Sequence, residues 1–125
     1  MTQFFAAQQQ VNDWIKTSGI RYFNEMTNLS NLMEETGELA SLMGRVYGEQ
    51  SFKKGKAPEC PKSAIADELT DVLFIVLCLA NQMDVDLDEA FKVNMSKKTN
   101  RDGTRHLCNE KLKPREINAE TADEQ

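Results

Sequence analysis

Polar and apolar positions divide this chain into four segments with helical spacing, and the most distinctive of them is Pro61–Met83. Its acidic lead-in gives way to an uninterrupted apolar run from Val72 to Ala80. That run is too short to cross a bilayer, which needs about 20 residues. The whole segment is too long for a strand and lacks strand-like alternation in its lead-in. We therefore predict one helix with Pro61 in or near its first turn, where the missing N–H costs little.

Two carboxylates lie on an apolar face of this predicted helix. Glu68 and Asp71 are three residues apart and share a face with Val72, Ile75 and Leu79. The opposite face is apolar as well, with Leu73, Val76, Leu77 and Ala80. A helix that is apolar all round is buried all round, and a chain of 125 residues rarely buries one helix completely. The pattern therefore predicts an oligomer.

Two further helices are predicted before this one. The first runs from Thr2, a candidate cap, to about Ser18. Its apolar stripe is Phe4, Ala7, Val11, Trp14 and Ile15. The second runs from about Thr27 to Tyr47, with a stripe of Leu29, Leu32, Met33, Ala40, Met43 and Tyr47. Trp14 is by default a core residue, and the alternative is an indole that stacks on a nucleotide base.

A fourth helix is predicted to open at Asp86, which with Glu89 resembles a capping box, and to end at Asp102-Gly103. One side of it is apolar, with Leu87, Ala90, Phe91 and Met95, and the other is polar and basic, with Asn94, Lys97, Lys98 and Arg101. Residues 1–103 thus form one all-α, four-helix-bundle-like domain. Residues 104–125 are predicted to form a polar and flexible tail, disordered and acidic from Glu116.

Charge and cysteine usage narrow the possible partners and the compartment. The net charge is −5 and the pI about 4.9, which argues against binding to nucleic-acid polymers or anionic membranes. The cysteines, Cys60, Cys78 and Cys108, are odd in number and lack metal-ligand spacing, so they favour a reducing cytoplasm over a disulfide framework. The only histidine, His106, makes histidine-based catalysis and most zinc sites improbable.

Two predicted helices each present a pair of carboxylates three residues apart, Glu35 with Glu38 and Glu68 with Asp71. Helices joined as a hairpin pack antiparallel, so these pairs can face each other. Facing carboxylates repel and need neutralising, and neither motif contains an Arg or Lys. Carboxylate oxygens suit Mg²⁺, with Mn²⁺ as a substitute. The alternatives are two solvated glutamate faces, which are common, and a di-iron site, which would require Glu-x-x-His pairs that this chain lacks.

The sequence Glu34-Glu35-Thr36-Gly37-Glu38, followed by Glu68-Leu69-Thr70-Asp71, resembles the EExxE…ExxD signature of the MazG-type all-α nucleotide pyrophosphohydrolases. The resemblance extends from about Trp14 to Arg101. It implies an oligomeric helical bundle, a homodimer or homotetramer, that uses Mg²⁺ and water to hydrolyse a nucleoside triphosphate to monophosphate and pyrophosphate. A role in clearing the nucleotide pool fits this reaction.

The resemblance also implies roles for individual residues. Glu35, Glu38, Glu68 and Asp71 would be the metal ligands, and Glu34 would orient or deprotonate water. Asn94, Lys97, Lys98 and Arg101 are the candidates to hold phosphates. The rival from another class is a non-catalytic helical oligomerisation or binding module with a vestigial acidic site.

The connection Gly48–Cys60 has loop composition, is longer than most helix connections and carries Lys53, Lys54 and Lys56. The default interpretation is a solvated lysine loop. The alternative is a flexible lid that meets phosphate.

Overall fold

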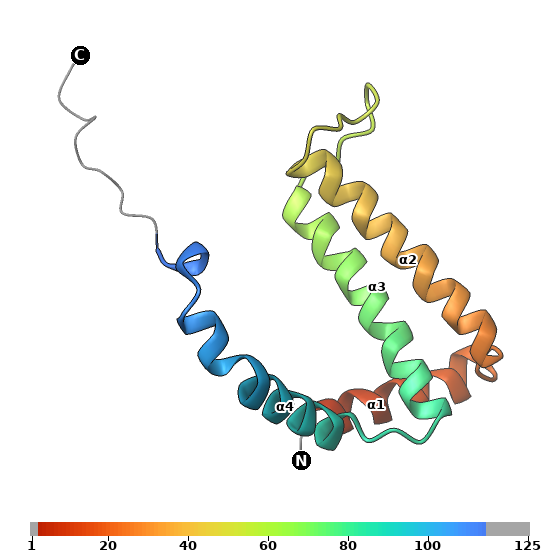
Figure 1. Ribbon diagram of the computed structural model, residues 1–125. Coiled ribbons are helices and arrows are strands. Elements are labelled where there is room, and N and C mark those ends of the chain that lie inside the picture. The colour runs from red at the N-terminus through yellow and green to blue at the C-terminus, as the bar shows by residue number, and fades with distance from the viewer. Residues whose placement is uncertain (1–2, 115–125) are drawn as a thin grey trace. The chain divides into compact units, whose positions relative to one another are not determined.

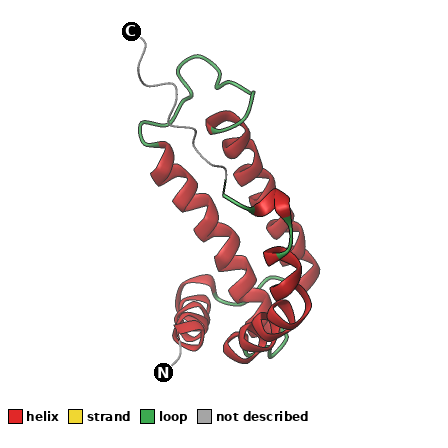
Figure 2. Cartoon of the chain, turned by 60° about the vertical axis from the view of Figure 1, so that its left-hand side comes forward, coloured by secondary structure: helices red, strands yellow, loops and turns green. Residues whose placement is uncertain are grey.

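The protein is described by a computed structural model over residues 3–114. These residues form four α-helices joined by loops and short helical turns, and no strand occurs among them (Figure 2). The all-α fold class predicted from the sequence is therefore confirmed. The chain divides into two compact units, the first ending at Asp88 and the second beginning at Glu89.

Helix α1 (Gln3–Trp14) continues into a π-helical turn, Ile15–Gly19, so the helical segment ends where the sequence predicted. The chain leaves this turn through Ile20, whose φ of 71° stops the helix. Val11 and Ile15 are buried against Leu77 and Cys78 of α3 and form the centre of the hydrophobic core. The predicted cap Thr2 lies outside the described residues.

Helices α2 (Glu25–Val46) and α3 (Pro61–Gln82) form an antiparallel hairpin, as the upper loop in Figure 1 shows. Helix α2 begins two residues earlier than predicted, because the Asn24 side chain accepts a hydrogen bond from the Met26 N–H at 2.9 Å. Pro61 occupies the first turn of α3, as predicted. Within residues 3–114, no helix combines the length and the apolar character that a membrane crossing requires.

A set of hydrogen-bonded side chains, which we name the amide cluster, joins α1 to the C-terminal end of α3. It consists of Gln8, Asn12, Tyr22 and Asn81. Gln8 donates to Asn81 Oδ1 at 3.0 Å and to the Val85 carbonyl at 2.8 Å, and its Oε1 accepts the Leu87 N–H at 3.2 Å. Asn81 in turn donates to the Gln8 carbonyl and to the Tyr22 hydroxyl. These bonds fix α1 across the end of the hairpin.

The apolar stripes predicted for α1 and α2 are only partly buried within one chain. Trp14 is 51% exposed, and the side chains of Leu29, Met33 and Met43 on α2 and of Tyr47 just past its end are all exposed. On α3, the residues Ile75, Leu77, Cys78 and Ala80 are buried, while Leu73 is 46% exposed. Within one chain α3 is therefore only partly buried, because α1 and α2 cover only part of its surface, and its complete burial by a second subunit stays a prediction.

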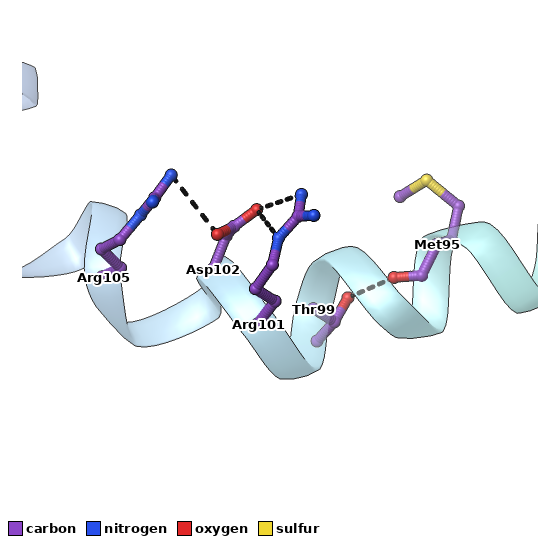
Figure 3. Close-up of polar contacts among 5 residues, drawn as sticks. All are labelled: Met95, Thr99, Arg101, Asp102 and Arg105. Carbon is purple, nitrogen blue, oxygen red and sulfur yellow. Dashed lines mark hydrogen bonds and ion pairs between the residues drawn. The ribbon is translucent and has the colours of Figure 1, made fainter.

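Helix α4 (Leu87–Leu107) extends past Asp102-Gly103, where the sequence was expected to end it. Asp102 Oδ2 accepts from Arg101 Nε at 3.0 Å and Nη2 at 2.8 Å, and Asp102 Oδ1 pairs with Arg105 at 3.4 Å, one turn further on (Figure 3). The pair with Arg105, at i, i+3, spans the glycine and supports the helix there. At the other end, Asp86 caps the helix as predicted, since its Oδ1 accepts the Asp88 N–H at 3.0 Å. The predicted acidic tail from Glu116 lies outside the described residues.

Candidate metal centre and its flanking cavities

Three of the four predicted ligands converge in the middle of the α2–α3 hairpin. Glu35 of α2 and Glu68 and Asp71 of α3 each offer a carboxylate oxygen, and these oxygens lie within 4.8 Å of one another. We name these three residues the carboxylate cluster. The convergence follows from helix geometry, because residues three or four apart share a face and the hairpin turns the two faces toward each other.

The surroundings of the carboxylate cluster disfavour the ionised form of Glu35 and of Glu68. The largest cause is desolvation, which raises the pKa of Glu35 and of Glu68 above their ordinary values. The negative charge of Glu38 is the next cause, and the negative charge of Asp71 raises both pKa values further. Glu38 thus lies close enough to act on the cluster although it is not one of the three converging groups. It is the fourth predicted ligand.

A divalent cation fits this donor set. Glu35 Oε2 and Glu68 Oε2 are buried and have no hydrogen-bond partner among the described residues. A buried acceptor without a partner is costly, and a hard cation coordinated by carboxylate oxygens removes that cost. No Arg or Lys of the described residues forms an ion pair with these carboxylates, so protein cations do not neutralise them.

A cavity of about 410 Å³ opens on one side of the carboxylate cluster. Glu35 and Asp71 form part of its wall, and Trp14 and Phe74 line it with their rings 5.7 Å apart in an edge-to-face arrangement. Its polar wall includes Asn28 and Asn31 of α2, together with Arg21 and Tyr22. Trp14 is therefore a partly exposed side chain at a cavity and not a core residue, which favours the alternative interpretation of this residue.

A second cavity, of about 480 Å³, lies on the other side of the carboxylates. Glu38 and Glu68 line it from the two helices, and Arg45, Lys53 and Lys56 line it from the end of α2 and the α2–α3 loop. Glu35 and Asp71 thus line the first, aromatic cavity, and Glu38 and Glu68, each one turn closer to the α2–α3 loop, line the second, cationic cavity.

The remaining predicted site residues are Glu34 on α2 and four residues on α4. Glu34 is exposed on α2 and lines neither cavity. Asn94, Lys97, Lys98 and Arg101 lie on α4 in the second unit, and the Arg101 guanidinium is engaged by Asp102. Their assigned roles stay predictions.

Several site residues were missed from the sequence although a signal for them existed. Asn28 and Asn31 precede Glu35 by seven and four residues, which places them on the same face of α2. Asn28 is buried and donates to Gln82 of α3 at 2.7 Å, so it links the start of α2 to the end of α3. Arg45 continues that face seven residues beyond Glu38.

Comparison with known proteins places this site in a family. The model of the MazG nucleotide pyrophosphohydrolase domain matches residues 23–106, more than half of the chain. YpjD from Bacillus subtilis (strain 168) is 40% identical over 98 residues, which are 78% of this chain and 85% of that protein. The chain therefore belongs to the MazG nucleotide pyrophosphohydrolase family.

Solved structures lead to the same family. The crystal structure of YpjD from Bacillus subtilis has a TM-score of 0.66 and 32% identity, with 78% of this chain and 95% of that chain covered. A Bacillus-conserved MazG protein, described as a nucleotide pyrophosphohydrolase, has a TM-score of 0.65 and 31% identity, with coverages of 84% and 98%.

Proposed function

We propose that this protein is a Mg²⁺-dependent hydrolase that cleaves a ribo- or deoxyribonucleoside triphosphate to the monophosphate and pyrophosphate. The observation that carries the proposal is the carboxylate cluster, whose oxygens lie within 4.8 Å of one another and include two buried oxygens without hydrogen-bond partners. Membership of the MazG family supports the same reaction class. Clearing of the nucleotide pool in the cytoplasm is the cellular role that we expect for it.

In this proposal Glu35, Glu38, Glu68 and Asp71 would hold Mg²⁺, or Mn²⁺ in its place. When bound there, the ion would supply positive charge to offset the phosphate oxygens and would lower the pKa of water. Glu34 orients the attacking water or accepts its proton. The water oxygen forms a bond to the α-phosphorus, and the bond from that phosphorus to the bridging oxygen breaks, so pyrophosphate leaves with the electron pair.

Water is the simplest nucleophile because the cysteines are poorly suited to the task. Burial raises the pKa of the Cys78 thiol to about 11. Cys60 is exposed at the start of α3 and lines neither cavity, and Cys108 is exposed beyond the end of α4. Neither motif of carboxylates contains a serine or histidine.

The cavity beside Glu35 and Asp71 is the place that we propose for the nucleoside, with Trp14 stacking on the base. Aromatic stacking tolerates every base, so this contact supports affinity without selecting one nucleotide. The family resemblance further suggests that Asn94, Lys97, Lys98 and Arg101 of α4 contact phosphates.

A homodimer or homotetramer is the assembly that we propose. The exposed apolar side chains on α2 and α3 include Met26, Leu29, Met33, Leu69 and Leu73. On each helix they recur at helical spacing, so each helix carries an exposed apolar stripe, which a second copy of the chain would cover. Light scattering at micromolar concentration should report a multiple of the 14.2 kDa chain mass, and a monomer would contradict the assembly.

The reaction is tested with a panel of nucleotides and MgCl₂, with pyrophosphate release as the readout. In ¹⁸O-labelled water the label should enter the monophosphate and be absent from pyrophosphate. Label in pyrophosphate would show attack at the β-phosphorus, and orthophosphate as the first product would show attack at the γ-phosphorus. Lack of turnover with every nucleotide would favour the alternative, a non-catalytic module with a vestigial acidic site.

A further inference from the structure

Near its start, the α2–α3 loop forms hydrogen bonds with the last turn of α2. The Gln50 N–H donates to the Gly44 carbonyl at 3.3 Å, and the Gln50 side-chain oxygen accepts from Arg45 Nη1 at 3.4 Å. Further along, Phe52 and Pro58 are half-buried and line the cationic cavity. The loop therefore has a defined course beside Glu38 and Glu68.

A tight turn in this loop determines which of its three lysines line the cationic cavity. The Lys56 N–H donates to the Lys53 carbonyl at 2.9 Å, and Gly55 has a φ of 76°, in the region that favours glycine. The turn brings Lys53 and Lys56 together at its base, and both line the cationic cavity. Lys54 is at the tip and does not line it.

The charges in this cavity are arranged for an anion that carries a metal ion. Lys53, Lys56 and Arg45 line it together with Glu38 and Glu68, yet no ion pair joins the two sets of charges in the described part of the chain. Arg45 is held in place by the Ser41 carbonyl at 2.9 Å and the Ser41 hydroxyl at 2.6 Å. A polyphosphate bound to Mg²⁺ satisfies both sets, since phosphate oxygens suit the cations and the metal suits the carboxylates.

We propose that Lys53 and Lys56, with Arg45, form a pyrophosphate-binding site that holds the β- and γ-phosphates of the substrate. This inference rests on the proposed function and adds the direction in which the nucleotide lies. The carboxylates lie between the aromatic cavity, which Trp14 lines, and the cationic cavity, which the loop lysines line. A nucleotide that crosses them has its nucleoside beside Trp14 and its leaving pyrophosphate beside the loop, with the scissile bond at the carboxylates.

The site is tested by titrating the full-length protein with inorganic pyrophosphate in MgCl₂, followed by calorimetry. Lys53→Met and Lys56→Met should each weaken binding about tenfold, the size expected for loss of one charge-assisted contact. Lys54→Met removes the same charge from the same turn and should change the affinity less than about twofold. Lys56→Arg should retain most of the affinity, because it keeps the charge.

The titration does not depend on turnover, so it separates this inference from the proposed function. Lysine-dependent pyrophosphate binding by a protein that hydrolyses no nucleotide would support the loop site and refute the function. Turnover with equal pyrophosphate affinity in all the loop variants, or no binding by the wild-type protein, would overturn the loop site. Loss of binding in Lys97→Met alone would assign the phosphates to α4 instead.

Discussion

The amide cluster and the carboxylate cluster are both groups of polar side chains partly withdrawn from water along α3, and they differ in whether their atoms have partners. In the amide cluster, Gln8 uses both its amide nitrogen and its oxygen in hydrogen bonds, and so does Asn81. In the carboxylate cluster, Glu35 and Glu68 each keep a buried oxygen without a partner among the described residues.

This difference in hydrogen bonding indicates that the two clusters of polar side chains have different roles, one in stability and one in ligand binding. Satisfied buried amides stabilise one arrangement of α1 on the hairpin, because any rearrangement would leave donors and acceptors unpaired. Carboxylates that repel one another instead reduce the stability of the ligand-free protein, and a cation would recover that loss on binding. Changes at the carboxylate cluster are therefore expected to affect activity and, without metal, the pH dependence of stability, whereas changes at the amide cluster should affect folding alone.

Asp71→Asn should cause the largest effect, a loss of turnover of about 10³-fold or more, since a metal site contributes several kcal/mol to the transition state. Glu38→Gln should act in the same direction. Helical circular dichroism should be retained in both variants, because each removes a repulsive charge and keeps the side-chain volume. Steady-state pyrophosphate release gives the activity.

The matched control is Asp67→Asn, which changes an exposed acid of the same helix that lines neither cavity. It should keep activity within about twofold of the wild-type value. Normal turnover in Asp71→Asn would remove this residue from the mechanism, and a severe loss in Asp67→Asn would show that overall charge, not ligation, governs the rate.

Gln8→Ala should lower the free energy of unfolding by about 2 kcal/mol, because it leaves the Asn81 oxygen, the Val85 carbonyl and the Leu87 N–H without their partner. Urea denaturation measures the change. Gln10→Ala, an exposed position on the same helix, should be close to neutral. A neutral Gln8→Ala would mean that the amide cluster does not hold α1 in place.

The smallest effect concerns pH in the metal-free protein. The raised pKa of Glu35 and Glu68 means that the folded state binds their protons more tightly than the unfolded chain. The stability from these groups is therefore complete below their ordinary pKa of 4.5 and falls as pH rises through the folded pKa. The Tm of the wild-type protein should decrease between about pH 5 and pH 8 more than that of the Glu35→Gln/Glu68→Gln variant.

MgCl₂ should remove this difference, because a bound cation stabilises the charged carboxylates. Thermal unfolding with and without MgCl₂, in both proteins, is the measurement. An equal pH slope in the two metal-free proteins would show that the repulsion within the carboxylate cluster is too weak to affect folding.

The fold and the centre of the site could be predicted because both depend on short-range periodicity. The i, i+3 spacing of Glu35 with Glu38 and of Glu68 with Asp71, on two helices joined as a hairpin, was enough to predict that the pairs converge. Exposure was less predictable. Trp14 and Met33 match the core pattern of their helices, yet they are exposed, because spacing does not reveal how much of a helix its neighbours cover.

The cavities were predictable only in part, since loops and side-chain amides have no period. The loop lysines were recognised as a composition, but the turn that separates Lys54 from Lys53 and Lys56 depends on the conformation of Gly55. The extension of α4 beyond Gly103 also went against a local signal, because the i, i+3 ion pair of Asp102 with Arg105 counteracts the low helix propensity of glycine.

The α2–α3 hairpin affects the order in which parts of the molecule form during folding. The three converging carboxylates all lie between Glu35 and Asp71, on consecutive helices joined by one loop, so the ligand set needs contacts of shorter sequence separation than the docking of α1. The docking of α1 on α3 joins positions more than seventy residues apart, as the Gln8–Asn81 bond illustrates, and contacts of larger separation cost more loop-closure entropy and form more slowly. We expect the metal-binding half of the molecule to take shape before its N-terminal helix docks, and divalent cations to increase the refolding rate.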